Sequence, residues 1–213
     1  LTINADSQSD GGGTISTSYE ISHGGDISLE ADTYTIAANI NSGSSDNLTI
    51  TASSGATTTI GLGDGATGTV NIDATEAAYL QSDGNGTLVI GADGQSGAVD
   101  ANDVTFKINT TIYGGDLDVT SITAGATGNK TLTLDVGAIA EASADSGADL
   151  TATTLTITSS AAIGAGGAVE TDVDTLVITA TSGDVTLAEN DGLALGAINV
   201  GSNTLTVSSG GAI

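Results

Sequence analysis

The chain has 213 residues, of which 31 are glycine and only 2% are aromatic, and it contains no proline, cysteine, methionine or tryptophan. Two lysines, no arginine and 26 carboxylates give a formal net charge of -24, which repels nucleic-acid phosphates and anionic lipids alike. This restricted set of residue types argues against an ordinary enzyme. The apolar runs are too short to insert into a membrane.

The composition does not shift along the chain. Threonine, serine, alanine, aspartate and glycine recur from end to end without a proline-marked linker, so we expect residues 1–213 to form a single continuous unit. The chain begins with the strand-like residues 1–3 and shows no signal peptide, which indicates a mature segment or a fragment of a longer chain. The absence of cysteine fits an extracellular bacterial protein that is stabilised by stacking.

Short strand-like phrases recur along the chain, each with aliphatic residues two positions apart. In a strand this spacing puts the aliphatic side chains on one face and the threonines between them on the other. A glycine-aspartate pair opens three of these strands, at residues 25–26, 115–116 and 183–184. The threonine-aliphatic phrases are, in chain order, residues 47–50 (NLTI), 87–90 (TLVI), 131–134 (TLTL), 154–157 (TLTI), 175–178 (TLVI) and 204–207 (TLTV).

The intervals between these phrases predict the architecture. Leu155 and Leu176 are 21 residues apart, and Leu48, Val70 and Leu88 follow one another at intervals of 22 and 18. An interval of about twenty suits one turn of a three-sided helix. We therefore predict an all-β fold, a right-handed parallel β-helix (β-solenoid) of about ten coils spaced roughly 4.8 Å apart. The alternative is a β-sandwich array, as in surface-layer proteins, which would need antiparallel pairs and much longer repeats.

Helix and nucleotide-binding signals are weak. The best helix candidates are the alanine-rich residues 74–81 and 136–148, which are short or interrupted by glycine, so we expect them at most as insertions on corners. Residues 63–68 have the glycine spacing of a dinucleotide fingerprint. The strand-like residues 69–72 follow them, however, where that motif requires a helix, and we expect no nucleotide site.

The three glycine-aspartate strands and the final residues 204–213 (TLTVSSGGAI) resemble the repeat region of filamentous haemagglutinin-like proteins, large secreted exoproteins of Gram-negative bacteria. The resemblance spans most of the chain. It implies a right-handed parallel β-helix, an extracellular or cell-surface location and an adhesive role.

Carboxylates gather in one glycine-rich stretch. Asp93, Asp100 and Asp103 lie close together in the sequence, and they are the candidate ligands for calcium, which prefers oxygen donors. Their spacing matches neither an EF-hand loop nor a glycine-rich calcium nonapeptide, so diffuse binding of divalent cations is favoured over a specific calcium site. Lesser acidic pairs are Asp145 with Asp149, Asp172 with Asp174, and Glu189 with Asp191.

The expected function is a structural or adhesive extracellular fibre or surface-filament module, and not an enzyme. A single histidine, His23, and no cysteine leave no catalytic triad, zinc site or cofactor site to predict. Neither end reads as a polar cap, which predicts end-to-end association with copies of itself into a filament or sheath. Cell-surface receptors or glycans are further expected partners. The alternatives are a glycan-binding or ice-binding solenoid, with outward threonines such as Thr131 and Thr133, and more remotely an enzyme acting on acidic polysaccharides.

Overall fold

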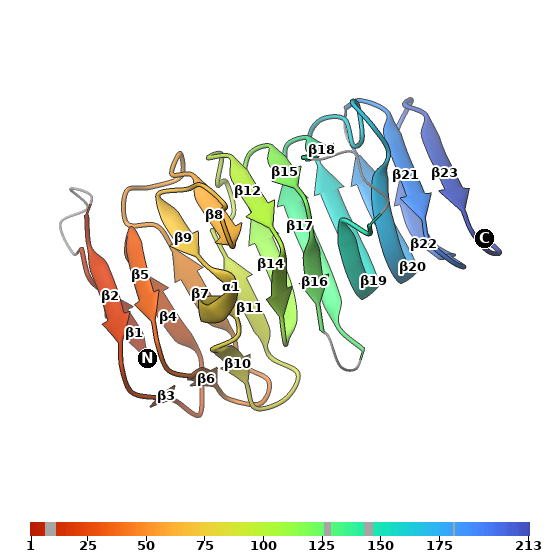
Figure 1. Ribbon diagram of the computed structural model, residues 1–213. Coiled ribbons are helices and arrows are strands. Elements are labelled where there is room, and N and C mark those ends of the chain that lie inside the picture. Colours follow the sequence, from red (N-terminus) through yellow and green to blue (C-terminus); the bar gives the residue numbers. More distant parts are fainter. Residues whose placement is uncertain (7–11, 126–128, 143–146, 181) are drawn as a thin grey trace.

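The computed structural model describes residues 1–6, 12–125, 129–142, 147–180 and 182–213. They form a β-solenoid of about nine turns, in which equivalent positions of successive turns lie about 21 residues apart. Figure 1 shows the turns following one another from the N-terminal to the C-terminal end. Every strand pair among the described residues is parallel. The predicted all-β parallel solenoid is therefore confirmed, with about nine turns in place of the expected ten.

One side of the solenoid, which we call the main face, receives a strand from every turn. These strands pair in one uninterrupted ladder, so their backbone hydrogen bonds run along the long axis. In ladder order they are β1 (Thr2–Asn4), β4 (Ile27–Glu30), β7 (Leu48–Thr51), β11 (Thr87–Ile90), β14 (Asn109–Tyr113), β17 (Thr131–Val136), the second half of β19 (Leu150–Ser159), the second half of β20 (Val169–Ala180) and β22 (Ala194–Asn199).

Shorter strands line the other sides of each turn. The long strands β19 and β20 bend around a corner, so their first halves pair on a second side. The remaining strands group as β2 (Thr14–Thr17) with β5 (Thr33–Ile36); β3 (Ile21–Ser22) with β6 (Ile40–Ser42) and β10 (Leu80–Ser82); β9 (Val70–Ile72) with β8 (Ile60–Gly63), β12 (Val99–Asn102), β15 (Leu117–Val119) and β18 (Ile139–Glu141); β13 (Val104–Phe106) with β16 (Ile122–Ala124); and β21 (Val185–Glu189) with β23 (Leu205–Ser209).

The period-two pattern of the sequence builds the interior. In β17, Leu132 and Leu134 are fully buried, whereas Thr131 and Thr133 point outward and remain partly exposed. Leu132 lies in register with Leu155, which in turn lies in register with Leu176. Each such aliphatic side chain contributes roughly 1.5–3 kcal/mol by leaving water. Because each inner turn covers the turns on both sides of it, the stability of the fold comes from the stack.

Two buried positions on the main face, Thr110 and Ser159, are polar. Thr110 is only 1% exposed and stands in register between Leu88 and Leu132. Its hydroxyl donates to the carbonyl oxygen of Ile108 at 3.1 Å, so this buried group has its partner within the local chain.

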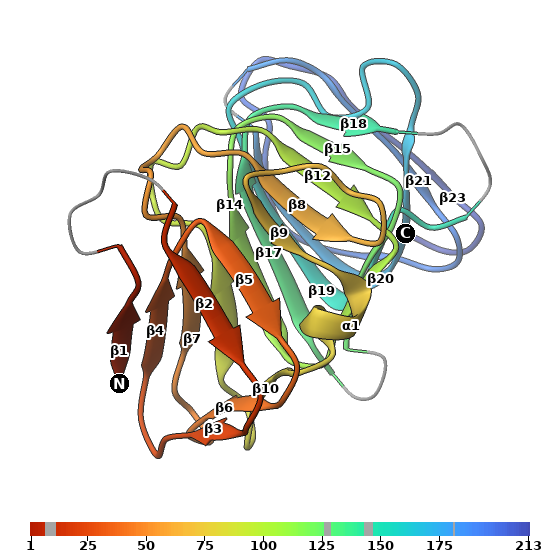
Figure 2. The ribbon, with the colours of Figure 1, turned by 60° about the vertical axis from the view of Figure 1, so that its left-hand side comes forward.

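The turn that contains β7 and β8 carries an insertion, and here one expectation is wrong. The intervals of 22 and 18 residues predicted that Val70 lies on a strand stacked between those of Leu48 and Leu88. We call each strand of such a stack a rung. Leu48 instead pairs directly with Leu88, and Val70 pairs with Ile60 on another side of the solenoid. Strand β9 is thus an extra rung that lies between β8 and β5 (Figure 2). The glycine-rich loop before β9 lets the chain turn back for this additional pass.

A single helical turn, α1 (Ala74–Ala77), follows β9 within the first helix candidate. Asp73 and Glu76 form a capping box, since the side chain of each accepts the backbone N–H of the other. The second candidate, residues 136–148, is wrong over its described part, where β18 stacks on β15. There, tertiary stacking overrides the weak preference of alanine for helix. No helix among the described residues is long and apolar enough to span a membrane.

The buried side chains form one hydrophobic cluster that extends from Ile15 to Leu193. Valine, isoleucine, leucine and alanine supply most of it, as the composition predicted. The few aromatic residues have unlike surroundings, since Phe106 is fully buried, Tyr34 is 5% exposed and Tyr19 is 86% exposed. Phe106 and Tyr34 therefore contribute nothing to an exposed aromatic surface.

Candidate functional site

The aspartates of the three glycine-aspartate phrases have a structural role. Each carboxylate accepts the backbone N–H of the residue that precedes the strand stacked one turn later. These bonds, all 2.8 Å long, are donated to Asp26 by Asn47, to Asp116 by Ala138 and to Asp184 by Thr204. The donated N–H groups lie at corners, where a side-chain acceptor supplements the strand ladder. These three carboxylates therefore stabilise the fold.

Asp32 is a buried clamp that joins three successive turns. It is 5% exposed and accepts hydrogen bonds from the N–H of Gly12 at 3.1 Å, the N–H of Ser54 at 2.9 Å and the hydroxyl of Ser53 at 3.0 Å. The hydroxyl of Ser54 also donates to it. Burial acts to raise the pKa of Asp32, but these hydrogen bonds, led by those from Ser54, lower it below its ordinary value.

The three aspartates that the sequence singled out each have a separate setting. None of them belongs to a described group of three carboxylates whose oxygens lie within 4.8 Å of one another. Asp100 accepts the N–H and the hydroxyl of Thr67 at 2.7 and 2.9 Å, and it stands in register with Asp118. Asp103 has a left-handed backbone, with φ of 50°, at the corner after β12. Asp93 lines a different pocket from Asp100. Calcium binding by these three residues stays a prediction.

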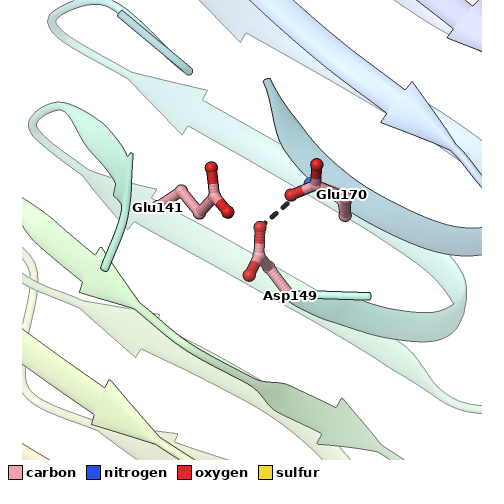
Figure 3. A group of neighbouring side chains, drawn as sticks. All are labelled: Glu141, Asp149 and Glu170. Atoms are coloured by element: carbon pink, nitrogen blue, oxygen red, sulfur yellow. Dashed lines mark hydrogen bonds between the residues drawn. The ribbon is translucent and has the colours of Figure 1, made fainter. Parts of the chain in front are cut away.

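A different set of carboxylates converges near the start of β19. Glu141 ends β18, Asp149 directly precedes β19, and Glu170 is the second residue of β20. Each offers an oxygen within 4.8 Å of the other two, and Figure 3 shows the side chains pointing toward one another. Asp149 is 2% exposed, while Glu141 and Glu170 are partly exposed. We call these three residues the carboxylate triad.

The backbone fixes two members of the carboxylate triad in neighbouring turns. The N–H of Asp149 donates to the carbonyl oxygen of Glu170 at 2.9 Å, and the N–H of Glu170 donates to the Asp149 carboxylate at 2.9 Å. A side chain at Gly167 would approach a carboxylate oxygen of Glu141 to 2.8 Å, so glycine there leaves room for that carboxylate. The position of the triad is therefore set by strand pairing and by a tight corner.

The triad is an unfavourable place for three negative charges. Burial raises the pKa of Asp149 to about 7, and the carboxylates of Glu170 and Glu141 act in the same direction, although the N–H of Glu170 opposes them. Low-dielectric surroundings and like charges both disfavour the ionised form of a carboxyl group. At neutral pH, Asp149 therefore needs a proton or a nearby cation.

In a second acidic group, on the last turns, the buried member is already satisfied by the protein. The group consists of Asp172, Glu189 and Asp191, whose oxygens also approach within 4.8 Å. Glu189 is 4% exposed, and its two oxygens accept the hydroxyl of Thr171 at 2.6 Å and the N–H of Val173 at 3.1 Å. Its buried carboxylate therefore needs no further partner.

Sequence reasoning found parts of these groups without assembling them. The predicted pair of Glu189 with Asp191 is brought together, and Asp172 joins it, whereas Asp174, the expected neighbour of Asp172, is outside the group. Asp149 was also in a predicted pair, but its expected neighbour Asp145 lies outside the described residues. The missed signal was the distance along the chain. Asp149 and Glu170 are 21 residues apart, which is the interval between stacked turns.

Comparison of the chain with protein-family models, with curated proteins and with solved structures finds no match. The fold itself is that of a β-solenoid repeat protein. Its function is therefore inferred from the fold and from the geometry of its surface groups.

Proposed function

We propose that the chain is a structural module of an extracellular surface fibre or adhesin, as its resemblance to filamentous haemagglutinin-like proteins implies. The observation that carries this proposal is the main face, on which one strand of every turn stacks on the next. Outward residues such as Thr111, Thr133 and Thr156 occupy equivalent positions on three successive strands. With about 4.8 Å between neighbouring strands, the stack extends about 40 Å along its axis.

The ladder and the charge of the chain suit an exposed fibre. Strand N–H and C=O groups pair with the turns on either side, so extension along the axis must break many hydrogen bonds together. The net charge of -24 keeps such rods soluble and separate where salt is dilute. In saline surroundings the Debye length falls to roughly 8 Å, and the same rods can approach one another.

Association between copies is part of the proposal. In the last turn, β22 pairs with β20 alone among the described strands, and Leu195 is 47% exposed. A further turn stacked there would cover both, whether it came from a continuation of this chain or from another copy. Sedimentation velocity over a concentration series tests whether another copy stacks there. Oligomers that the substitution Leu195→Asp disperses support association, and a monomer at every concentration contradicts it.

Location is tested by immunogold electron microscopy of the source cells with antibodies raised against the purified chain. The proposal predicts labelled fibres or a labelled layer on the cell surface. Label confined to the cell interior would overturn the assignment. Adhesion of beads coated with the chain to host or neighbouring cells then separates an adhesin from a passive fibre.

A second candidate function is binding to an uncharged, regular surface such as a glycan or ice. It is favoured by two neighbouring outward columns on the main face that contain no charged residue, in a chain with 26 carboxylates. The columns are Ser28, Thr49, Val89, Thr111, Thr133, Thr156 and Val177, and beside them Thr87, Asn109, Thr131, Thr154 and Thr175.

Retention on insoluble polysaccharides and incorporation into growing ice test this second candidate. Thr133→Glu places a charge in the middle of the uncharged columns and should abolish retention. Thr123→Glu, a matched change at a partly exposed position of β16, should leave retention unchanged. Equal retention of both variants, or no retention of the unmodified chain, contradicts a binding role for the main face.

A further inference from the structure

The carboxylate triad of Glu141, Asp149 and Glu170 lacks a cationic side chain to balance it. The chain has two lysines and no arginine. The ammonium group of Lys107 donates to the carbonyl oxygen of Ala78 at 2.8 Å, and that of Lys130 lies 3.4 Å from the carbonyl oxygen of Gly84. Both ammonium groups are thus engaged on other parts of the solenoid, so a proton within the triad or a bound cation must balance its charge.

A second observation concerns the carboxylate of Glu170. The Oε2 atom of Glu170 is shut off from solvent and has no hydrogen-bond partner. The other two such side-chain atoms in the described part of the chain are neutral, the hydroxyl oxygen of Thr17 and the amide oxygen of Asn41. A buried carboxylate oxygen without a partner carries a large desolvation cost, whereas a bound cation would coordinate it.

We propose that Glu141, Asp149 and Glu170 bind a divalent cation, calcium, which ties neighbouring turns of the solenoid together. The ion would receive carboxylate oxygens from β18, from the residue before β19 and from β20. It would also neutralise the Glu170 carboxylate, one oxygen of which is buried. It would thereby convert a local repulsion between turns into an attraction.

The donor set selects the class of ion. All three ligands are hard oxygen donors, and the chain has no cysteine, which argues against zinc and other soft-ligand metals. Magnesium usually keeps several waters and is bound through one or two carboxylates, whereas calcium takes more oxygen ligands from the protein, so a site of three carboxylates favours calcium. The three oxygens lie within 4.8 Å of one another and can therefore contact one ion. Backbone carbonyl groups and water would complete the six to eight ligands that calcium usually takes.

Isothermal titration of the whole 213-residue chain with calcium chloride tests the proposal, in chelator-treated buffer at about 0.15 M sodium chloride to suppress diffuse attraction. We expect saturable binding of calcium at the triad and a rise in Tm that an equal ionic strength of sodium chloride does not reproduce. Magnesium should bind more weakly. A heat signal that never saturates, or that sodium abolishes, would show diffuse attraction only and overturn the proposal.

Two variants and a matched control assign the binding to the triad. Glu170→Gln keeps the shape of the side chain and removes one ligand charge, so it should weaken calcium binding by roughly tenfold or more. Asp174→Asn removes one charge from an exposed position of the same strand, outside both acidic groups, and should leave the affinity unchanged. If circular dichroism shows that Glu170→Gln does not fold, Glu141→Gln takes its place. Calcium binding of the unmodified strength in the folded triad variant contradicts the site.

Discussion

Replacement of Ile157 by alanine perturbs the interior of the stack at β19, the seventh of the nine main-face strands. Ile157 is 0% exposed and lies in register between Leu134 and Ile178 on the main face. Isoleucine-to-alanine changes in close-packed cores cost about 2–5 kcal/mol, because the lost apolar transfer energy and the new cavity both count. The neighbouring rungs cannot move into the gap without straining ladder hydrogen bonds, so we expect the upper part of this range, about 3–5 kcal/mol. For a chain of this length the loss corresponds to a fall in Tm of roughly 6–20 °C.

Thermal unfolding followed by circular dichroism measures this loss. The control is Thr156→Ala, one residue earlier in the same strand, where the side chain points outward and is partly exposed. It should change the free energy of unfolding by no more than about 0.5 kcal/mol. Because solenoid turns support one another, the Ile157 variant should also lose cooperativity as the turns before and after β19 unfold separately. Equal effects of the two substitutions would refute the inward and outward assignment.

The remaining predictions concern charge. Asp116→Ala removes the acceptor for an N–H of the next turn and should cost about 1–3 kcal/mol in urea unfolding, whereas Asp116→Asn, which keeps an acceptor, should cost less than half as much. The pKa of Asp149, raised to about 7 by burial and by Glu170 and Glu141, stabilises the fold at low pH, and that contribution is lost as the pH rises through about 7. In metal-free buffer the Tm should therefore fall between pH 5 and pH 8, and Asp149→Asn should flatten this decline. The lowered pKa of Asp32 has the opposite sign, so its stabilisation is present above about pH 4 and is lost on further acidification, which an acid titration of Asp32→Asn against the unmodified chain would show. Sodium chloride raised from about 0.01 to 0.15 M should increase the Tm, because it screens the self-repulsion of a chain with net charge -24.

The repeat interval and the alternation of aliphatic residues were enough to predict the solenoid. Phrases such as residues 131–134 and 154–157 lie where their spacing places them, in register on the main face. Intervals alone did not distinguish an extra rung from a main-face rung, because the period-two pattern of β9 is the same as that of its neighbours. They also did not reveal Thr110 as a core residue, since its polarity matches that of the outward threonines.

The acidic groups were harder to predict than the strands. Neighbours in the sequence, such as Asp93 and Asp100, were grouped because they share one stretch, but a solenoid brings together residues one turn apart. Asp149 and Glu170 meet for that reason, at an interval of 21 residues. Glu141 joins them from β18, and its separation from Asp149 does not match the repeat interval.

Distances between pairs of spin labels test the stacking in register most directly. The chain has no cysteine, so labels can be attached to pairs of cysteines introduced in one outward column of the main face. Thr49 and Thr156 are four rungs apart through β11, β14 and β17, which predicts a separation of about 19 Å between their backbones. Ser28 and Val177 are six rungs apart, which predicts about 29 Å. Electron-resonance distances that grow linearly with the number of rungs agree with the stack, and distances unrelated to rung number contradict it.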